Sequence, residues 1–135
     1  MLDRAVQDVL AQTRQDWELV IINDAGDRGG VEEVVARHAV EADGRLRVIH
    51  RETSTGMEAA SNHGLRETAA PTVVVHDDDD TWHATFLQES LAHLAAHPER
   101  EAVVVRTLIV HERETATGFV EDAVFPSWPE LEGVR

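Results

Sequence analysis

Apolar residues recur along the chain in two patterns, helical spacing and short unbroken runs. Helical spacing predicts four helices, over residues 2–14, from 31 through 38, over about 57–68 and from 84 to 96. Short apolar runs bounded by polar residues predict buried strands over 17–23, 46–50, 72–76 and 102–110. The segment "RETATG", followed by the apolar "FVEDAVF", predicts a C-terminal β-hairpin.

Helices and strands alternate up to about residue 105, which is typical of one α/β fold class. This order predicts an open, mostly parallel sheet with helices on both faces, in a single domain over residues 1–135. Residues 113–135 are expected to form an irregular extension beyond the sheet. Ligands of such sheets bind at the carboxyl ends of the strands. Two polar segments follow strands there: "NDAGDRGG", which contains Asp24, and "DDDDT".

The charge balance narrows the classes of partner. The formal net charge is −14 and every cation is an arginine, so binding to a nucleic-acid backbone is disfavoured. The chain has no cysteine, which excludes thiolate chemistry and zinc–sulfur sites. No apolar run is long enough to span a bilayer, and the first residues lack the order of a signal peptide, so we expect a cytoplasmic protein. A phosphate-bearing ligand would need a cation as mediator.

The stretch "TVVVHDDDDTW" places four aspartates directly behind a buried-strand pattern. On an extended segment Asp77 and Asp79 would share one side, and their mutual repulsion favours uptake of a cation. Carboxylate oxygens suit Mg²⁺ or Mn²⁺, which keep coordination positions open for phosphate oxygens. A metal–diphosphate site is therefore one interpretation. The other is a solvated acidic loop that also caps the following helix.

Three stretches together resemble the nucleotide-binding half of a family 2 glycosyltransferase, which has the GT-A fold. They are "VLAQTRQDWELVIINDAGD", "GMEAASNHGLRETAAPTVVVHDDDD" and "FLQESLAHLAAHPE". They occur in the order that the family shows, and the resemblance covers about residues 2–105. The first resembles a helix, a glutamine-threonine turn, a strand and an acidic loop. The second resembles a glycine, an alanine-x-asparagine helix, a strand and the DxD motif, and the third resembles the helix that follows.

The resemblance implies roles for five residues. Asp24 falls where the family reads the nucleobase, and Asn62 falls on the asparagine of the alanine-x-asparagine segment. Asp77, Asp78 and Asp79 fall on the DxD region, which holds the ribose and, chiefly through the last aspartate with Asp77 beside it, a divalent Mn²⁺ or Mg²⁺. The implied reaction transfers a sugar from a nucleoside-diphosphate sugar, a UDP-sugar being favoured, to an acceptor hydroxyl.

Two departures from the family pattern bear on activity. The family begins with a central strand reading like "VSVIIPTYN" before the first helix, and this sequence opens in the helix. A partner chain could repair that gap, so we expect a homodimer. The acceptor-side half, which carries the general base, normally extends further. The segment "VED" offers Glu121 and Asp122 as weak catalytic candidates, although a surface turn is the simpler interpretation.

Two alternative functions stay open at this point. "VVVHDDDDT" also fits the opening motif of haloacid-dehalogenase-like phosphatases, with Asp77 as nucleophile, Asp79 as acid and Mg²⁺ bound. That family requires a later lysine, and the chain contains none. A non-catalytic or truncated GT-A-like module is the second alternative, because a fold does not guarantee a function.

Overall fold

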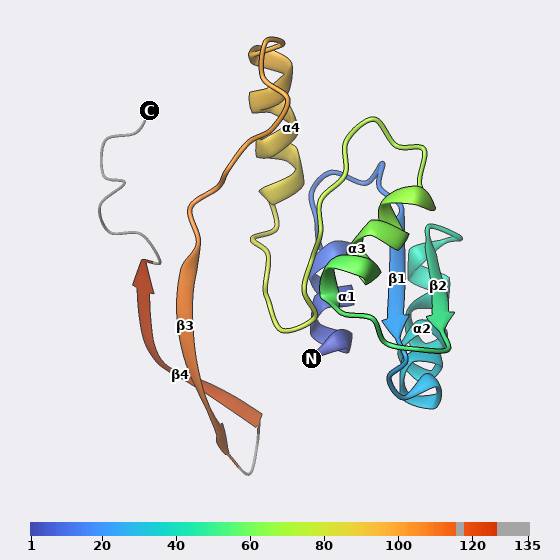
Figure 1. Cartoon of the computed structure of the whole chain (residues 1–135). Helices are drawn as coiled ribbons and strands as arrows, with labels where there is room; N and C mark the ends of the chain where they lie inside the picture. The colour runs from blue at the N-terminus through green and yellow to red at the C-terminus, as the bar shows by residue number, and fades with distance from the viewer. Residues whose placement is uncertain (116–117, 127–135) are drawn as a thin grey trace. The chain divides into compact units, whose positions relative to one another are not determined.

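The computed structural model describes residues 1–115 and 118–126, in two compact units, Met1–Leu91 and Ala92–Arg135, each described here by itself (Figure 1). The elements of the first unit are α1 (Leu2–Leu10), β1 (Leu19–Asp24), α2 (Arg28–Ala42), β2 (Leu46–Arg51) and α3 (Met57–Arg66). Helix α4 (Phe86–Ala96) runs across the division, and β3 (Leu108–Thr115) and β4 (Gly118–Pro126) belong to the second unit. Within the described ranges, no helix is both long and apolar enough to cross a membrane.

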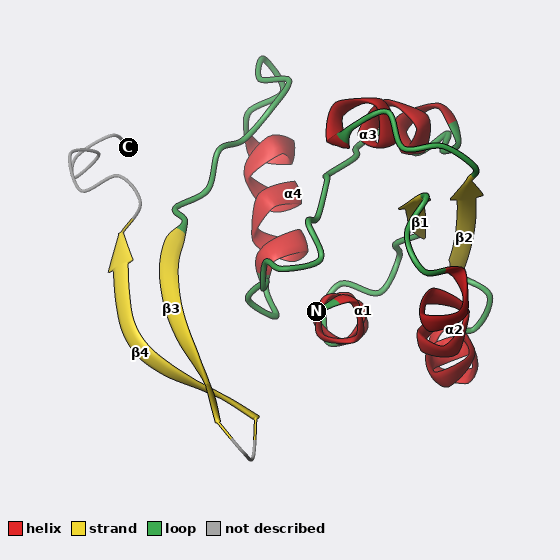
Figure 2. Ribbon diagram, turned by 60° about the horizontal axis from the view of Figure 1, so that its bottom comes forward, coloured by secondary structure: helices red, strands yellow, loops and turns green. Residues whose placement is uncertain are grey.

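Strands β1 and β2 form a parallel pair that confirms the predicted α/β class. Their register runs from Leu19 opposite Leu46 to Asp24 opposite Arg51. Helix α3 packs against β1 and α2 packs against β2, and Figure 2 shows the two helices on opposite faces of the pair. Helix α3 lies within van der Waals reach of β1 at Gly64, where a Cβ would lie 3.4 Å from Cγ1 of Ile22.

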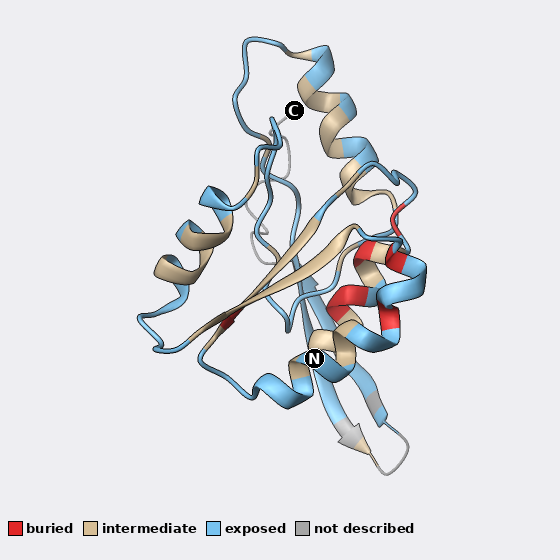
Figure 3. Ribbon diagram, turned by 90° about the vertical axis from the view of Figure 1, so that its right-hand side faces the viewer, coloured by how far each residue is buried: buried red, intermediate tan, exposed pale blue. Residues whose placement is uncertain are grey.

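The fully buried apolar residues lie on α1 and α2 (Figure 3). They are Ala5, Val6, Val9 and Ala42. Polar contacts join the same two helices, since Oδ1 of Asp3 accepts from Nη1 of Arg37 at 2.6 Å and lies 2.9 Å from Nε2 of His38. The core of the unit is therefore densest beside α1, and the strands carry only half-buried side chains at most of their positions.

The prediction of a strand over residues 72–76 is wrong. The segment is extended, but in the described part of the chain its backbone forms no hydrogen bond with another backbone group. Its three valines are 46–53% exposed. An apolar run becomes a parallel strand only where a neighbouring strand supplies the ladder. The pattern of the run was read correctly, but no described strand lies beside it.

The C-terminal hairpin is confirmed, with shifted boundaries. Strands β3 and β4 are antiparallel, from Leu108 opposite Pro126 to Thr115 opposite Gly118, with an irregularity between His111 and Glu112. The predicted strand over 102–110 is therefore wrong in its first half, because only Leu108 onward joins a ladder. Part of the extension expected to be irregular is the hairpin itself, and residues 116–117 and 127–135 lie outside the described residues.

Candidate functional site

Strand β1 delivers Asp24 to the carboxyl edge of the parallel pair. The chain turns immediately afterwards, with Ala25 in the left-handed region at φ 62°. The side chain of Asn23 stabilises this turn, since its Oδ1 accepts from the backbone N–H of Gly26 at 2.9 Å and its Nδ2 donates to the carbonyl of Gly26 at 3.2 Å. A Cβ on Gly26 would lie 2.8 Å from that Oδ1, so this turn requires glycine there. Helix α2 then begins behind the cap of Asp27.

Several donors converge on the carboxylate of Asp24. Ser54 Oγ donates to Oδ2 at 2.7 Å, and Nη1 of Arg51 lies 2.5 Å from Oδ1. The hydrogen bond from Ser54 first, and then the charge of Arg51, hold the pKa of Asp24 below its ordinary value. Asp24 is therefore an ionised, acceptor-only group at neutral pH, at the edge where ligands of parallel sheets bind.

The carboxylate of Asp24 and its basic partner belong to adjacent strands, and the register of β1 and β2 places them side by side. Arg51 lies directly opposite Asp24 at the end of β2, and its Nη2 also contacts Thr55 Oγ1 at 2.5 Å. An open cavity of about 260 Å³ lies at the same edge. Its lining residues are Asn23, Ala25, Gly26, Arg28, His50, Arg51 and Glu52. The cavity is polar and includes two guanidinium groups, which suits an anionic or strongly polar ligand.

The aspartate cluster occupies a turn after the extended segment. The backbone N–H of Asp80 donates to the carbonyl of Asp77 at 3.1 Å, so the expected extended alternation of side chains does not hold here. Asp77, Asp78, Asp79 and Asp80 are all exposed. The guanidinium of Arg4 on α1 contacts this turn, since its Nη2 donates to the carbonyl of Asp79 at 3.2 Å.

The donor chemistry of the cluster fits a hard divalent cation. Among the described residues, however, no group of three or more histidine, cysteine, aspartate or glutamate side chains converges in a way that could hold a metal ion. Mg²⁺ and Mn²⁺ commonly take one or two carboxylates and complete their coordination with water and ligand phosphate. Two carboxylates such as those of Asp77 and Asp79 match the number that a protein commonly contributes to such a site.

Aromatic contacts fix the position of the chain next to the cluster of four aspartates. The ring of His76 stacks on Trp82, with centroids 4.0 Å apart, and Trp82 lies 4.6 Å from Phe86. Burial lowers the pKa of His76, so its ring is neutral at pH 7. The turn of aspartates therefore lies on a chain segment that is anchored by stacking just before and just after it.

Sequence reasoning did not single out Gln12 and Thr13, which fix the chain after the aspartates. Gln12 is 1% exposed; its Nε2 donates to the carbonyl of His83 at 2.9 Å, and its Oε1 accepts from the N–H of Leu87 at 3.0 Å. The N–H of Thr13 donates to the carbonyl of Ala84 at 2.8 Å. The glutamine-threonine turn was visible as a pattern, but its partners lie about seventy residues away.

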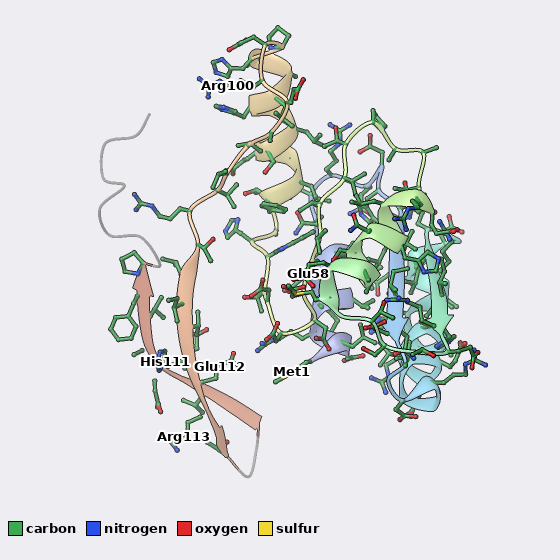
Figure 4. The ribbon with its side chains drawn as sticks, in the orientation of Figure 1. Met1, Glu58, Arg100, His111, Glu112 and Arg113 are labelled. Atoms are coloured by element: carbon green, nitrogen blue, oxygen red, sulfur yellow. The ribbon has the colours of Figure 1, made fainter. Side chains whose placement is uncertain are left out.

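The remaining predicted site residues lie on other elements. Asn62 is exposed on α3, next to Ser61, whose hydroxyl donates to the carbonyl of Met57 at 2.9 Å. Glu121 and Asp122 belong to β4 of the second unit, so their interpretation as a surface turn is wrong. Asp122 Oδ2 accepts from Nε of Arg113 at 3.2 Å across the hairpin, where Figure 4 labels Arg113 on β3. A pairing across strands accounts for Asp122.

The fold is that of an α/β, GT-A-like domain. A family model described as "Glycosyl transferase family 2" matches residues 1–121. The chain therefore belongs to glycosyltransferase family 2. This membership confirms the family resemblance and weighs against the phosphatase alternative, which the absence of lysine already disfavoured.

Individual relatives are named glycosyltransferases. The uncharacterized glycosyltransferase YwdF of Bacillus subtilis is 29% identical over 130 residues, which cover 96% of this chain and 40% of YwdF. The uncharacterized glycosyltransferase alr2836 of Nostoc is 32% identical over 87 residues, covering 64% of this chain and 26% of that relative. The chain thus spans less than half the length of the relatives that it matches. No solved structure matches it significantly.

Proposed function

We propose that this chain forms the donor-binding part of a glycosyltransferase that takes a nucleoside-diphosphate sugar and passes the sugar to an acceptor hydroxyl. The observation that carries the proposal is the ionised carboxylate of Asp24 at the sheet's carboxyl edge, in a chain that belongs to family 2. Asp24 would bind the nucleobase, with Asn62 of α3 contributing to the same ligand.

Hydrogen-bond chemistry limits the bases that suit the carboxylate of Asp24. An ionised carboxylate only accepts, so the base must present an N–H to Asp24. Uracil presents its ring N–H between two carbonyl oxygens, and the guanidinium of Arg51, 2.5 Å from Asp24, could donate to one of those oxygens. Cytosine offers an unprotonated ring nitrogen at that position and would face the carboxylate with a lone pair. Thymine and guanine also present a ring N–H, so the preference for a UDP-sugar as the donor rests on the family resemblance.

The aspartate turn would hold the other end of the nucleotide. Asp77 and Asp78 would bind the ribose, and Asp79, with Asp77, would hold Mn²⁺ or Mg²⁺. When bound, such an ion supplies Lewis-acid stabilisation of the charge on the leaving diphosphate. The exposed carboxylates make this role accessible from solvent. The general base and the acceptor are not identified.

Calorimetry tests the binding proposal without requiring catalysis. UDP should bind in the presence of MnCl₂, should bind far more weakly with EDTA, and should bind better than CDP under the same conditions. Asp24→Asn and Asp79→Asn should each weaken binding by at least about tenfold, because each removes a charge-assisted contact worth roughly 1.5–3 kcal/mol. Glu41→Gln, an exposed acid on α2, is the charge-matched control and should bind as the parent does.

Different outcomes separate the alternatives. Binding without turnover of any sugar nucleotide would indicate an incomplete or non-catalytic module, whereas no binding of any nucleoside diphosphate would refute the proposal. The homodimer and the cytoplasmic location expected from the sequence stay predictions. Light scattering coupled to gel filtration measures the molar mass and so tests the dimer directly.

A further inference from the structure

A second polar network lies behind Asp24, on the α2 face of the parallel pair. Successive side chains of a strand alternate between its two faces, so Asn23 and Asp24 point to opposite sides. Asp24 contacts Arg51 on one side. Asn23 lies opposite His50 in the register and contacts it on the other side, where His50 also contacts Glu32 of α2. The network therefore touches the chain at Asp24 without sharing its contacts.

The backbone fixes the orientation of the Asn23 amide. Its Oδ1 accepts from the N–H of Gly26 at 2.9 Å, and a backbone N–H can only donate. The two hydrogens of Nδ2 are then directed elsewhere, one to the carbonyl of Gly26 at 3.2 Å and the other to Nδ1 of His50 at 2.9 Å. Because an amide nitrogen accepts no hydrogen bond, Nδ1 of His50 is the acceptor in this pair.

The contacts of His50 therefore select one tautomer of its ring. A neutral imidazole with an unprotonated Nδ1 carries its hydrogen on Nε2. Nε2 lies 2.9 Å from Oε1 of Glu32, a carboxylate that accepts this hydrogen. The side chain of His50 is 10% exposed and Asn23 is 9% exposed, so water competes little for these hydrogen bonds. Both ring nitrogens thus have a partner of the matching kind.

The turn after β1 depends on the same hydrogen bonds. Ala25 has φ 62°, a left-handed conformation that is unfavourable for a residue with a Cβ. The two bonds from the Asn23 side chain to Gly26 stabilise this turn. Without an acceptor at His50, one buried N–H of the amide would lose its partner, and the amide would be free to rotate away from Gly26. Asp24 lies between Asn23 and Ala25, so a change in the turn would redirect its carboxylate.

We propose that His50 is a positioning residue for nucleobase binding. Its unprotonated Nδ1 holds the amide of Asn23, the amide holds the turn, and the turn sets the direction in which the carboxylate of Asp24 meets the base. His50 itself does not touch the ligand. This inference rests on the proposed function, in which Asp24 binds the base.

Two variants of matched shape isolate the contact between His50 and Asn23. His50→Asn keeps an acceptor oxygen next to Cγ, where Nδ1 lies, whereas His50→Leu puts a methyl group there. Both side chains are too short to reach Glu32, so loss of that contact is common to the two variants. His97→Leu, which removes a histidine of the second unit, is the control.

Nuclear magnetic resonance of the protein without ligand tests the network directly. Long-range ¹H–¹⁵N correlations of the ring should show His50 as the Nε2–H tautomer near neutral pH. Exchange of the Gly26 amide hydrogen should be at least about fivefold faster in His50→Leu and within about twofold of the parent in His50→Asn. Exchange in α1 serves as an internal reference for global stability.

Calorimetry with MnCl₂ tests the consequence for the base. His50→Leu should bind UDP at least about fivefold more weakly and should lose most of the parent's preference for UDP over CDP, whereas His50→Asn should keep both within about twofold. Methyl diphosphate, which has no base, should bind all variants as it binds the parent. A merely structural role for His50 would not change base preference while leaving the binding of methyl diphosphate unaffected.

Three results would overturn the inference alone. They are an Nδ1–H tautomer of His50, equal Gly26 exchange in His50→Leu and the parent, and an unchanged preference for UDP over CDP in His50→Leu when the parent binds UDP. Failure of the parent to bind any nucleoside diphosphate would instead refute the proposed function, and this inference with it. The spectra of the free protein would still report the tautomer and the turn, so the two failures can be told apart.

Discussion

Gln12 is the buried polar residue whose replacement should disturb the first unit most. Its side chain makes three hydrogen bonds, donating to the carbonyls of Asp8 and His83 at 3.0 and 2.9 Å and accepting from the N–H of Leu87 at 3.0 Å. The N–H of Leu87 lies in the first turn of α4, where helical N–H groups have no partner within the helix. Gln12 therefore caps α4 from a distant part of the chain.

These contacts determine how far Gln12→Leu should lower the free energy of unfolding. The carbonyl of His83 also accepts from the N–H of Phe86 at 2.9 Å, but the carbonyl of Asp8 and the N–H of Leu87 each lose the partner described for them. A buried polar group left without a partner costs about 1–3 kcal/mol, and both groups are partly accessible to water, so we take the low end and expect a loss of about 2 kcal/mol. For a unit of 91 residues this corresponds to a fall in Tm of about 8–16 °C.

Urea unfolding followed by far-UV circular dichroism measures the free energy of unfolding of the parent, Gln12→Leu and Gln7→Ala. Gln7 is an exposed glutamine on α1 that contacts Asp3, so its replacement should change the free energy of unfolding by no more than about 0.5 kcal/mol. Gln12→Glu should be destabilised near neutral pH, because it places a carboxylate oxygen against two carbonyls. A loss below about 0.5 kcal/mol for Gln12→Leu would refute the reasoning.

Three further predictions concern single positions. Because burial lowers the pKa of His76, the free energy of unfolding should fall as pH drops through its ordinary value of 6.5, and His76→Phe, which keeps a ring against Trp82, should reduce this dependence in urea titrations at pH 5 and 8. Gly64→Ala should stabilise α3 by about 0.5–1 kcal/mol in the same assay, since its Cβ would make an ordinary contact with Ile22; destabilisation would show that the packing is tighter. Because its partners lower the pKa of Asp24, UDP binding that depends on this carboxylate should persist as pH falls to its ordinary value of 3.8 and decline only below it; in calorimetry, a decline already complete at pH 5 would contradict this.

Local sequence patterns were sufficient to locate most of the helices and strands. Helical spacing located α1, α2, α3 and α4, and apolar runs located β1 and β2, because these patterns report directly which faces are buried. The run "TVVVH" shows the limit of this reasoning. Its pattern is typical of a buried strand. A strand forms only when its backbone can hydrogen-bond to an adjacent strand, however well its residue types suit a sheet.

Chemistry within one segment could also be read from the sequence. The position of Asp24 after a strand and the run of four aspartates were evident, and they pointed to one edge of a parallel sheet. The sequence did not indicate which side chains surround Asp24 or how the four aspartates are arranged. That Arg51 lies opposite Asp24 depends on the register between two strands, and the turn at Asp77–Asp80 depends on local hydrogen bonding.

The sequence by itself determined the fold class, the family resemblance and the residue types available for binding a nucleotide, because these depend on periodicity and on order along the chain. Only the tertiary structure decided which groups meet. The long-range contacts of Gln12 and Thr13 with 83–88 join residues about seventy positions apart, and the pairing of Asp24 with Arg51 joins two strands. Contacts at such separations arise from packing of the whole unit, which no local pattern records.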